Sequence, residues 1–476
     1  MQSHSTFIFD SYLWNPEAGT VQLKYSLDDE VHFTETLTFP SPPKLSPDRE
    51  EDFDRALFAL HLIGGISYYK TCLPKEIDVR SGTLTEAEAA FWNGVYENGL
   101  GEFFYRNNID FAGLINFRSN TSPESPNHPA GRRPALETSN QPTNQPINRL
   151  LIPIGGGKDS LVTAELVRNK AKDITLLRMG GHPLIDDLAS VSGFPLLTIK
   201  RALSPELFKL NADGALNGHV PITAYLSCVT IVTSLLYGFD DVVMSNERSA
   251  NIGNVAFRGK EINHQWSKSL EFEKAFQDYL KNSVTNRVQY FSLLRPLSEL
   301  RIAEIFTKFP QYFRCSTSCN TNWKILGKKD KGTDKDSKNP APHEGFSGQS
   351  TAGGVWCNHC PKCAFVFALY AAFLPLDELL RIFGKNLFDD ISILPLFQEL
   401  LGIQGFKPFE CVGTPEEAKA AFLLAHKKGE LNETVIMKMF VNEVLTKIKK
   451  PEALIKEVLA PVAEHAIPEE FRDVIR

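Results

Sequence analysis

The chain has 476 residues, with 51 basic and 57 acidic side chains and a formal net charge of −6. A chain of this length is too long to fold around one simple hydrophobic core, so we expect about two to four domains. The hydrophobic fraction of 42% and the charged fraction of 23% are ordinary for a globular protein, and the slight acidic balance argues against a general nucleic-acid-binding protein.

The N-terminus shows no basic segment followed by an apolar run, so we expect no signal peptide. The longest apolar stretch, 364–376, is too short to span a bilayer. We therefore predict a cytoplasmic protein without membrane contact. In that compartment its eight cysteines are reduced thiols or metal ligands rather than disulfides.

The first part of the chain mixes strand and helix patterns. Segments 6–15 and 20–39 alternate apolar and polar residues, which predicts strands. Segments 51–69 and 85–105 have helical periodicity, and Thr85 is placed to cap the second helix. We expect a small α+β unit.

Strand and helix patterns then alternate. The candidate strands are 150–154, 173–179, 194–200, 240–245 and 288–294. The clearest helices between them are 159–169, 221–237 and 269–282. This alternation predicts an α/β fold built on a doubly wound parallel sheet.

The rest of the chain completes the expected domain organisation. A proline-rich polar stretch predicts a disordered linker, and a lysine-rich polar stretch predicts a mobile insert in a cysteine-rich segment. The predicted parts are an N-terminal α+β unit 1–117, a linker 118–149, an α/β domain 150–310, a cysteine-rich module 311–370 with the insert 327–350, and a helical C-terminal region 371–476.

A glycine loop follows the apolar run at 150–154 and precedes a helical pattern. Its residues are Gly155, Gly156, Gly157, Lys158, Asp159 and Ser160. Glycines let backbone N–H groups converge on an anion, and a helix N-terminus adds positive charge. The spacing fits neither the Walker A nor the Rossmann pattern. A turn that only closes a strand–helix unit is the structural alternative.

The loop resembles that of the ATP pyrophosphatases, which usually reads Ser-Gly-Gly-x-Asp-Ser; Gly155 stands in place of the leading serine. A second fragment, 293–306, is similar to the Arg-Pro-Leu and following helix of those domains. The resemblance implies that the six loop residues hold the phosphates of ATP, with Mg²⁺. It also implies cleavage of ATP to AMP and pyrophosphate, a substrate activated as an adenylate, and an ATP pyrophosphatase domain at 150–310.

A cysteine knuckle lies in the module 311–370. Two residues between cysteines let thiolates share one tetrahedral ion, as in WCNHCPKCAF with Cys357, Cys360 and Cys363. We prefer Cys319 as the fourth ligand, because the deazaguanine-synthesising ATP pyrophosphatases have a similar Ser-Cys before their knuckle. Cys315 and His359 are the alternatives. The pattern predicts a structural Zn²⁺ site; buried or redox-active thiols are the other interpretation.

Polar residues gather where ligands bind in open α/β sheets, beyond the carboxyl ends of strands. Asn246, Glu247, Arg248 and Asn251 follow the strand 240–245. The start of the next helix carries His264, Gln265, Lys268 and Glu271. Capping or surface hydrogen bonding could explain each residue singly, but as a set on one rim they favour substrate binding.

Several stretches together resemble the UDP-N-acetylmuramoyl-L-alanyl-L-glutamate epimerase family of bacterial cell-wall synthesis. They are VHFTETLTFP, GGGKDS, SNERSANIGN, NHQWSKSLEFE, CPKCAFVFA and GFKPFECVG, spread over residues 31 to 413. The resemblance implies that UDP-MurNAc-L-Ala-L-Glu, ATP and water give the D-Glu epimer, AMP and pyrophosphate. An adenylated carboxyl acidifies the neighbouring Cα–H, so one group can remove the proton and another can return it.

This reaction assigns expected roles to further residues. The UDP diphosphate or the substrate carboxylates need arginines, for which the candidates are Arg248, Arg258 and Arg295. The candidates for the acid and base are His219, His264 and Cys411. A buried structural thiol is the alternative interpretation of Cys411.

Two rival functions share these features. One is another adenylating ATP pyrophosphatase that forms an amide or nitrile or modifies a nucleobase; a tRNA-modifying version would need a basic face, which the sequence does not show. The other is a nucleotide-binding or zinc-stabilised scaffold without activity, against which Lys158, Asp159 and Ser160 in the loop argue.

Overall fold

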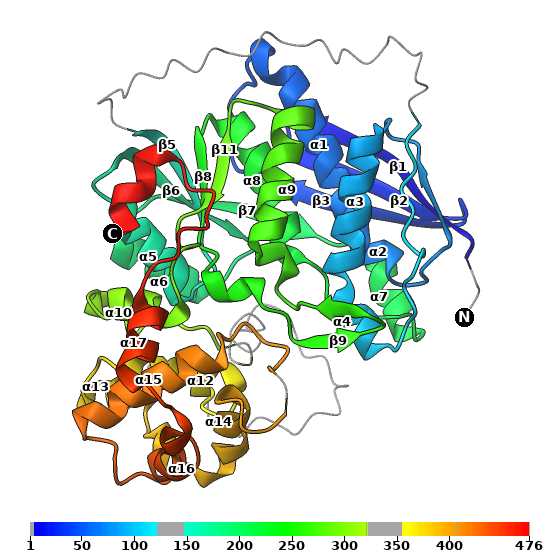
Figure 1. Ribbon diagram of the computed structural model, residues 1–476. Helices are drawn as coiled ribbons and strands as arrows, with labels where there is room; N and C mark the ends of the chain where they lie inside the picture. The colour runs from blue at the N-terminus through cyan, green and yellow to red at the C-terminus, as the bar shows by residue number, and fades with distance from the viewer. Residues whose placement is uncertain (1–3, 121–146, 320, 322–354, 406, 476) are drawn as a thin grey trace.

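The computed structural model describes residues 4–120, 147–319, 321, 355–405 and 407–475 (Figure 1). Most of the expected linker 118–149 and all of the expected insert 327–350 lie outside these residues, so both stay predictions.

A parallel sheet forms the centre of the fold, and each predicted strand of the α/β region is present. The strands run in the spatial order β11-β8-β5-β6-β7, and every neighbouring pair is parallel. Their bounds are β5 Ile147–Pro153, β6 Ala171–Met179, β7 Leu196–Ala202, β8 Asp241–Met244 and β11 Gln289–Ser292. The order reverses direction between β5 and β8, and such a switch point opens a crevice at the carboxyl edge of a sheet.

The N-terminal strands extend this same sheet. β3 pairs antiparallel with β7, with Thr36 opposite Ala202, and the order continues as β3-β2-β1-β4 to give nine strands. Their bounds are β1 Thr6–Asn15, β2 Thr20–Leu27, β3 Val31–Thr38 and β4 Glu76–Val79. The segment expected to form a separate α+β unit therefore shares its sheet with the α/β region.

A buried carboxylate marks the joint between β3 and β7. Glu35 has a fully buried side chain and accepts hydrogen bonds from Arg201 at 2.8 Å, from Tyr225 at 2.5 Å and from Tyr68 at 2.9 Å. The pairing with Arg201 offsets part of the cost of burying this charge and links β3 to β7 through their side chains.

Both faces of the sheet are covered, as the alternation of side chains along a strand requires. In β5, Leu150 and Ile152 belong to one apolar core and Leu151 to the other. The first core includes α5 (Lys158–Val167), α6 (Pro183–Ser192) and α10 (Glu299–Phe306). The second includes α1 (Glu50–Gly64), α3 (Glu86–Gly99), α8 (Ile222–Tyr237) and α9 (Leu270–Tyr279).

Local signals set several of the element ends. Thr85 caps α3 and forms a capping box with Glu88, as predicted. α4 (Gly101–Arg106) follows directly. The shorter elements are α2 (Ile66–Tyr69), α7 (Pro205–Ala212) and the hairpin of β9 (Val255–Phe257) and β10 (Lys260–Ile262).

The C-terminal region is helical, as predicted. Figure 1 shows α12 to α16 gathered in a lobe beyond α10 at one end of the sheet. The bounds are α12 Pro361–Ala371, α13 Leu376–Phe383, α14 Leu394–Leu400, α15 Pro415–Lys428, α16 Val435–Glu443 and α17 Pro451–Leu459. The apolar core of the lobe is continuous with that under α5 and α10. Across the described ranges, every helix is too short or too polar to cross a membrane.

Candidate active site

The glycine loop joins β5 to α5 at the switch point of the sheet. Gly156 has φ +84°, a conformation that favours glycine. A Cβ on Gly157 would lie 2.9 Å from the Ser318 Oγ, so the segment before Cys319 approaches the loop closely. Gly155 has open space around it, and no side chain caps α5. The first-turn N–H groups are thus placed to bind an anion.

Lys158 lies buried between two carboxylates at the start of α5. Its Nζ is 2.5 Å from Asp159 Oδ1 and also contacts Glu299, the first residue of α10. Burial alone would lower the pKa of Lys158, but Asp159 and Glu299 raise it above its usual value. Lys158 is therefore a fixed positive charge beneath the loop.

Three carboxylates meet beyond the carboxyl ends of β5 and β8. Asp159, Glu247 and Glu299 each offer an oxygen, and these oxygens lie within 4.8 Å of one another. Burial, with the charge of Glu299, raises the pKa of Glu247 to about 7. Burial would also raise the pKa of Glu299, but Lys158 and Lys362 lower it. A set of carboxylate oxygens suits a hard divalent cation such as Mg²⁺.

The three candidates for acid and base lie together in the structure. His264 donates from Nδ1 to the carboxylate of Glu102, and its imidazole interacts with the thiol of Cys411. His219 Nδ1 is 3.6 Å from the same carboxylate, and its ring centroid is 4.5 Å from that of His264. Lys268 Nζ donates to Cys411 Sγ at 3.4 Å.

Burial and neighbouring charges shift the pKa values of the three side chains in different directions. Burial would raise the pKa of Cys411, but Lys268, His264 and Lys362 lower it to about 5. Burial would lower the pKa of His264, but Cys411 and Glu102 raise it to about 9. Near neutral pH the pair is therefore a thiolate and an imidazolium. His219, whose pKa falls to about 4 through burial and the charge of His264, is neutral.

Two lysines connect the cysteine–histidine group to the glycine loop. Lys362 Nζ donates to the Cys411 carbonyl and lies 3.8 Å from Glu299 Oε1. The ammonium of Lys268 interacts with Cys411 and also with Glu247 and Asp159. The loop, the carboxylates and the thiol thus belong to one continuous site.

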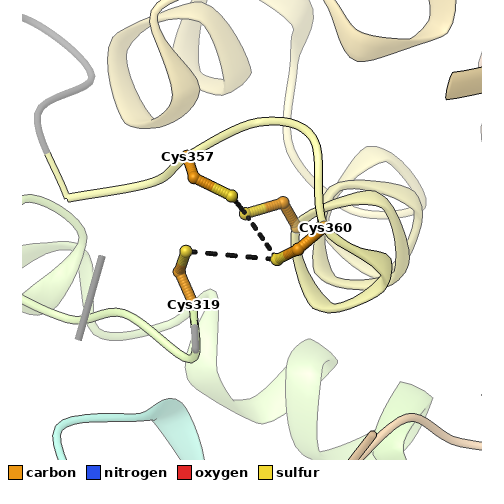
Figure 2. A group of neighbouring side chains, drawn as sticks. Cys319, Cys357 and Cys360 are labelled. Atoms are coloured by element: carbon orange, nitrogen blue, oxygen red, sulfur yellow. Dashed lines mark hydrogen bonds between the residues drawn. The ribbon is translucent and has the colours of Figure 1, made fainter. Parts of the chain in front are cut away.

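A cluster of four cysteines adjoins this site. Figure 2 shows Cys319, Cys357 and Cys360 with their sulfurs directed toward one another, and Cys319 Sγ is 4.0 Å from Cys360 Sγ. Cys363 Sγ is 3.5 Å from Cys360 Sγ and 3.7 Å from Cys357 Sγ. All four sulfurs lie within 4.8 Å of one another, so the set could hold a tetrahedral zinc ion. Cys315 lies outside the cluster; its thiol contacts the Tyr312 carbonyl at 3.7 Å.

Two family models match the chain. The MurL N-terminal domain covers residues 1–293, and the MurL C-terminal domain covers residues 344–454. The chain belongs to the MurL family. Each matched domain contains a part of the site: the glycine loop lies in the first domain and the Cys357–Cys363 knuckle in the second.

Three similar family members carry the same name. The chain is 37% identical over 473 residues to the UDP-N-acetyl-alpha-D-muramoyl-L-alanyl-L-glutamate epimerase of Xanthomonas oryzae pv. oryzae (strain MAFF 311018), covering 99% of this chain and 97% of that protein. The proteins with this name from Salinispora tropica and Micromonospora sp. (strain ATCC 39149) are 36% and 34% identical, with 98% and 97% of this chain covered, and 95% and 96% of theirs.

The three candidate arginines of this MurL-family chain differ in their contacts. Arg295 is fully buried and donates to Glu273 and to the carbonyls of Glu247 and Lys268, which fixes the backbone beside the site. Arg248 donates to two carbonyls at the end of α17. Arg258 is exposed at the β9–β10 turn and lies over the Phe257 ring.

The other expected rim residues include two with structural partners. Asn246 donates to Ser292 Oγ at 3.0 Å, and Asn251 Oδ1 accepts from the Leu270 N–H at 2.7 Å. Gln265 is buried, and among the described residues its amide oxygen and nitrogen have no hydrogen-bond partner. A bound polar ligand would supply such a partner.

Sequence reasoning missed three residues of the site. Glu102 stands within an amphipathic helical pattern and carries no motif. Glu299 follows the Arg-Pro-Leu fragment that the sequence did single out, and Lys362 lies inside the cysteine knuckle. Proximity to recognised motifs could have suggested the last two, whereas nothing in the local sequence marks Glu102.

Proposed function

We propose that this protein is an ATP-dependent epimerase that converts the terminal L-Glu of UDP-MurNAc-L-Ala-L-Glu to D-Glu in cytoplasmic peptidoglycan-precursor synthesis. The observation that carries the proposal is the continuity of the glycine loop with the group of Cys411 and His264. Activation of a carboxyl and transfer of the neighbouring proton require these two functions side by side. The epimerase name of three relatives, matched over nearly their whole length, supports the substrate.

Activation is assigned to the loop. The N–H groups of Gly155–Gly157 and the start of α5 would hold the ATP phosphates, with Lys158 and Ser160 contributing charge and a hydroxyl. Asp159, Glu247 and Glu299 would hold the Mg²⁺ that neutralises phosphate charge during transfer. Adenylation of the α-carboxyl, with release of pyrophosphate, removes the negative charge that otherwise prevents loss of the Cα proton.

Proton transfer is assigned to the group of His219, His264 and Cys411. Thiolates and imidazoles exchange protons near neutral pH, and these three side chains lie close together around the carboxylate of Glu102 and the ammonium of Lys268. The four-cysteine cluster would hold a structural Zn²⁺ that ties Cys319 to the knuckle. Because Thr317 donates its N–H to the Gly156 carbonyl at 2.9 Å, this cross-link would also support the loop.

Substrate recognition is assigned to the rim. Arg258, exposed on a hairpin turn, is the arginine best placed to reach the UDP diphosphate or a substrate carboxylate. Gln265 is a buried amide beside His264 that a polar substrate group would satisfy. The adenylate is finally hydrolysed, which releases AMP and the D-Glu product.

The test combines purified protein, ATP, Mg²⁺ and UDP-MurNAc-L-Ala-L-Glu, and it follows AMP release and the chirality of glutamate after acid hydrolysis. We expect substrate-dependent AMP together with D-glutamate. Asp159→Ala should abolish both while leaving the zinc content unchanged, and Glu206→Ala, which alters an exposed carboxylate on α7, is the matched control. AMP without D-glutamate would favour another adenylating ATP pyrophosphatase, and no AMP from folded protein would refute the loop assignment.

A further inference from the structure

We propose that the Cys411 thiolate removes the α-proton of the adenylated glutamyl residue, that the His264 imidazolium returns a proton to the opposite face, and that Glu102 is the positioning residue for His264. This inference rests on the proposed epimerisation and assigns its separate proton-transfer roles. It also gives the N-terminal segment a task in the reaction.

The geometry places three side chains next to one another: Glu102, His264 and Cys411. His264 donates from Nδ1 to Glu102, which fixes the orientation of its ring, and its imidazole interacts with the Cys411 thiol. The second oxygen of Glu102 accepts from Arg106 Nε at 2.5 Å, and the Glu102 side chain is only 6% exposed. Each element brings one member: α4, the loop before Trp266, and the loop before α15.

The charged groups that act most strongly on the thiol favour its ionised form. Those facing Cys411 are Lys268, His264, Lys362 and, farther away, Lys407. Those facing His264 are Glu102, which bonds to it, and the neutral His219, with Arg106 held on the far oxygen of Glu102. A thiolate held in this way is a base that burial alone would not produce.

The proton transfers balance. The Cα–H bond breaks, its proton goes to the Cys411 sulfur, and the electron pair enters the enolate of the adenylated carboxyl. An N–H bond of the His264 imidazolium then breaks, and that proton forms the new Cα–H bond on the other face. The pair is left as thiol and neutral imidazole. Because the imidazole interacts directly with the thiol, transfer of the proton from sulfur to nitrogen restores the starting state.

Two-sided transfer requires the Cα to lie between sulfur and imidazole, so the substrate must separate them during the reaction. Two lysines still stabilise the thiolate after this separation. Lys268 donates to the sulfur, and Lys362 donates to the backbone carbonyl of the same cysteine. Glu102 in turn holds the imidazole when its contact with Cys411 is broken.

The first test separates proton transfer from activation. Cys411→Ser should reduce D-glutamate formation at least 100-fold, the scale of acid–base catalysis. Substrate-dependent AMP should persist, because the L-adenylate still forms and is hydrolysed. The matched control is Cys72→Ser, which alters a partly buried free thiol in the N-terminal segment and should retain full activity. In D₂O the wild-type product should carry deuterium at Cα from the first turnover.

The outcomes distinguish the two proposals. If wild-type protein makes D-glutamate and Cys411→Ser makes it at a similar rate, the thiolate role is refuted and the epimerase function stands. If wild-type protein makes neither AMP nor D-glutamate, the proposed function itself fails. Loss of AMP together with D-glutamate in Cys411→Ser, in folded and zinc-loaded protein, would also overturn the assignment, because the thiol would then serve activation.

The second test addresses Glu102. Imidazolium is the required form of His264, so the rate falls as the pH rises through the pKa of this histidine. Glu102→Gln removes the carboxylate that holds this pKa high, and the alkaline limb of kcat/KM should move at least one pH unit lower. Glu102→Asp should restore part of the shift. A purely structural change would lower the rate without shifting the alkaline limb. An alkaline limb at the same pH in Glu102→Gln as in wild-type protein would therefore refute the positioning role.

Discussion

Lys268 should control the ionisation of Cys411. Its Nζ lies 3.4 Å from the sulfur. At that separation two unit charges attract by roughly 5 kcal/mol with an effective dielectric constant of about 20, equivalent to roughly 3.5 pKa units. His264 and Lys362 remain in Lys268→Met, and they retain part of the stabilisation. We therefore expect the pKa of Cys411 to rise by about 2–3 units in this variant.

The assay is the ultraviolet absorbance of the thiolate as a function of pH, taken as the difference from Cys411→Ser so that the other cysteines cancel. In wild-type protein the thiolate should persist down to a pH of about 5. In Lys268→Met, with a pKa of about 7–8, half or more of it should be protonated at pH 7. Lys274→Met, which removes an exposed ammonium on α9, is the control. An unchanged thiolate titration in Lys268→Met would refute the electrostatic reasoning.

Three further outcomes follow. Cys319→Ser should lose zinc by metal analysis while Cys315→Ser keeps it; equal zinc in both would contradict the four-cysteine set. D-glutamate formation should be bell-shaped in pH, falling below about 5 as Cys411 gains a proton and above about 9 as His264 loses one, and a flat profile across either value would contradict the pair. Arg295→Met leaves a buried carboxylate without its partner and should lower the free energy of unfolding in urea by about 3–5 kcal/mol, a loss that a surface ion pair would not produce.

The sequence predicted the α/β region well because its central strands β5 and β8 are buried on both faces. Short, near-continuous apolar runs such as those at β5 and β8 are typical of strands in a covered parallel sheet. The glycine turn comes directly after the first of these runs, at the switch point of the sheet. It could not predict that β3 joins β7. Strand pairing across more than 160 residues depends on side chains such as Glu35 and Arg201, which meet only in the folded chain.

The parts of the candidate site that lie in short sequence motifs could be predicted from the sequence. The glycine loop and the cysteine knuckle are short stretches whose spacing reflects their geometry, and Cys319 lies in the four-sulfur cluster. His219, His264 and Cys411 were chosen singly by residue type, and the fold brings them together. Glu102 was missed because its role comes from tertiary contacts with His264 and not from any pattern along α4.

The joint between β3 and β7 also bears on how the chain is made. The antiparallel ribbon β1–β3 can pair as soon as it leaves the ribosome, but β3 stays an open edge until β7 follows it. An open edge is a template for pairing with another nascent chain. Before Arg201 arrives, the carboxylate of Glu35 on that strand has no cation, and it would be costly to bury in a foreign sheet. The residue that later links β3 to β7 can therefore protect the unfinished protein from aggregation.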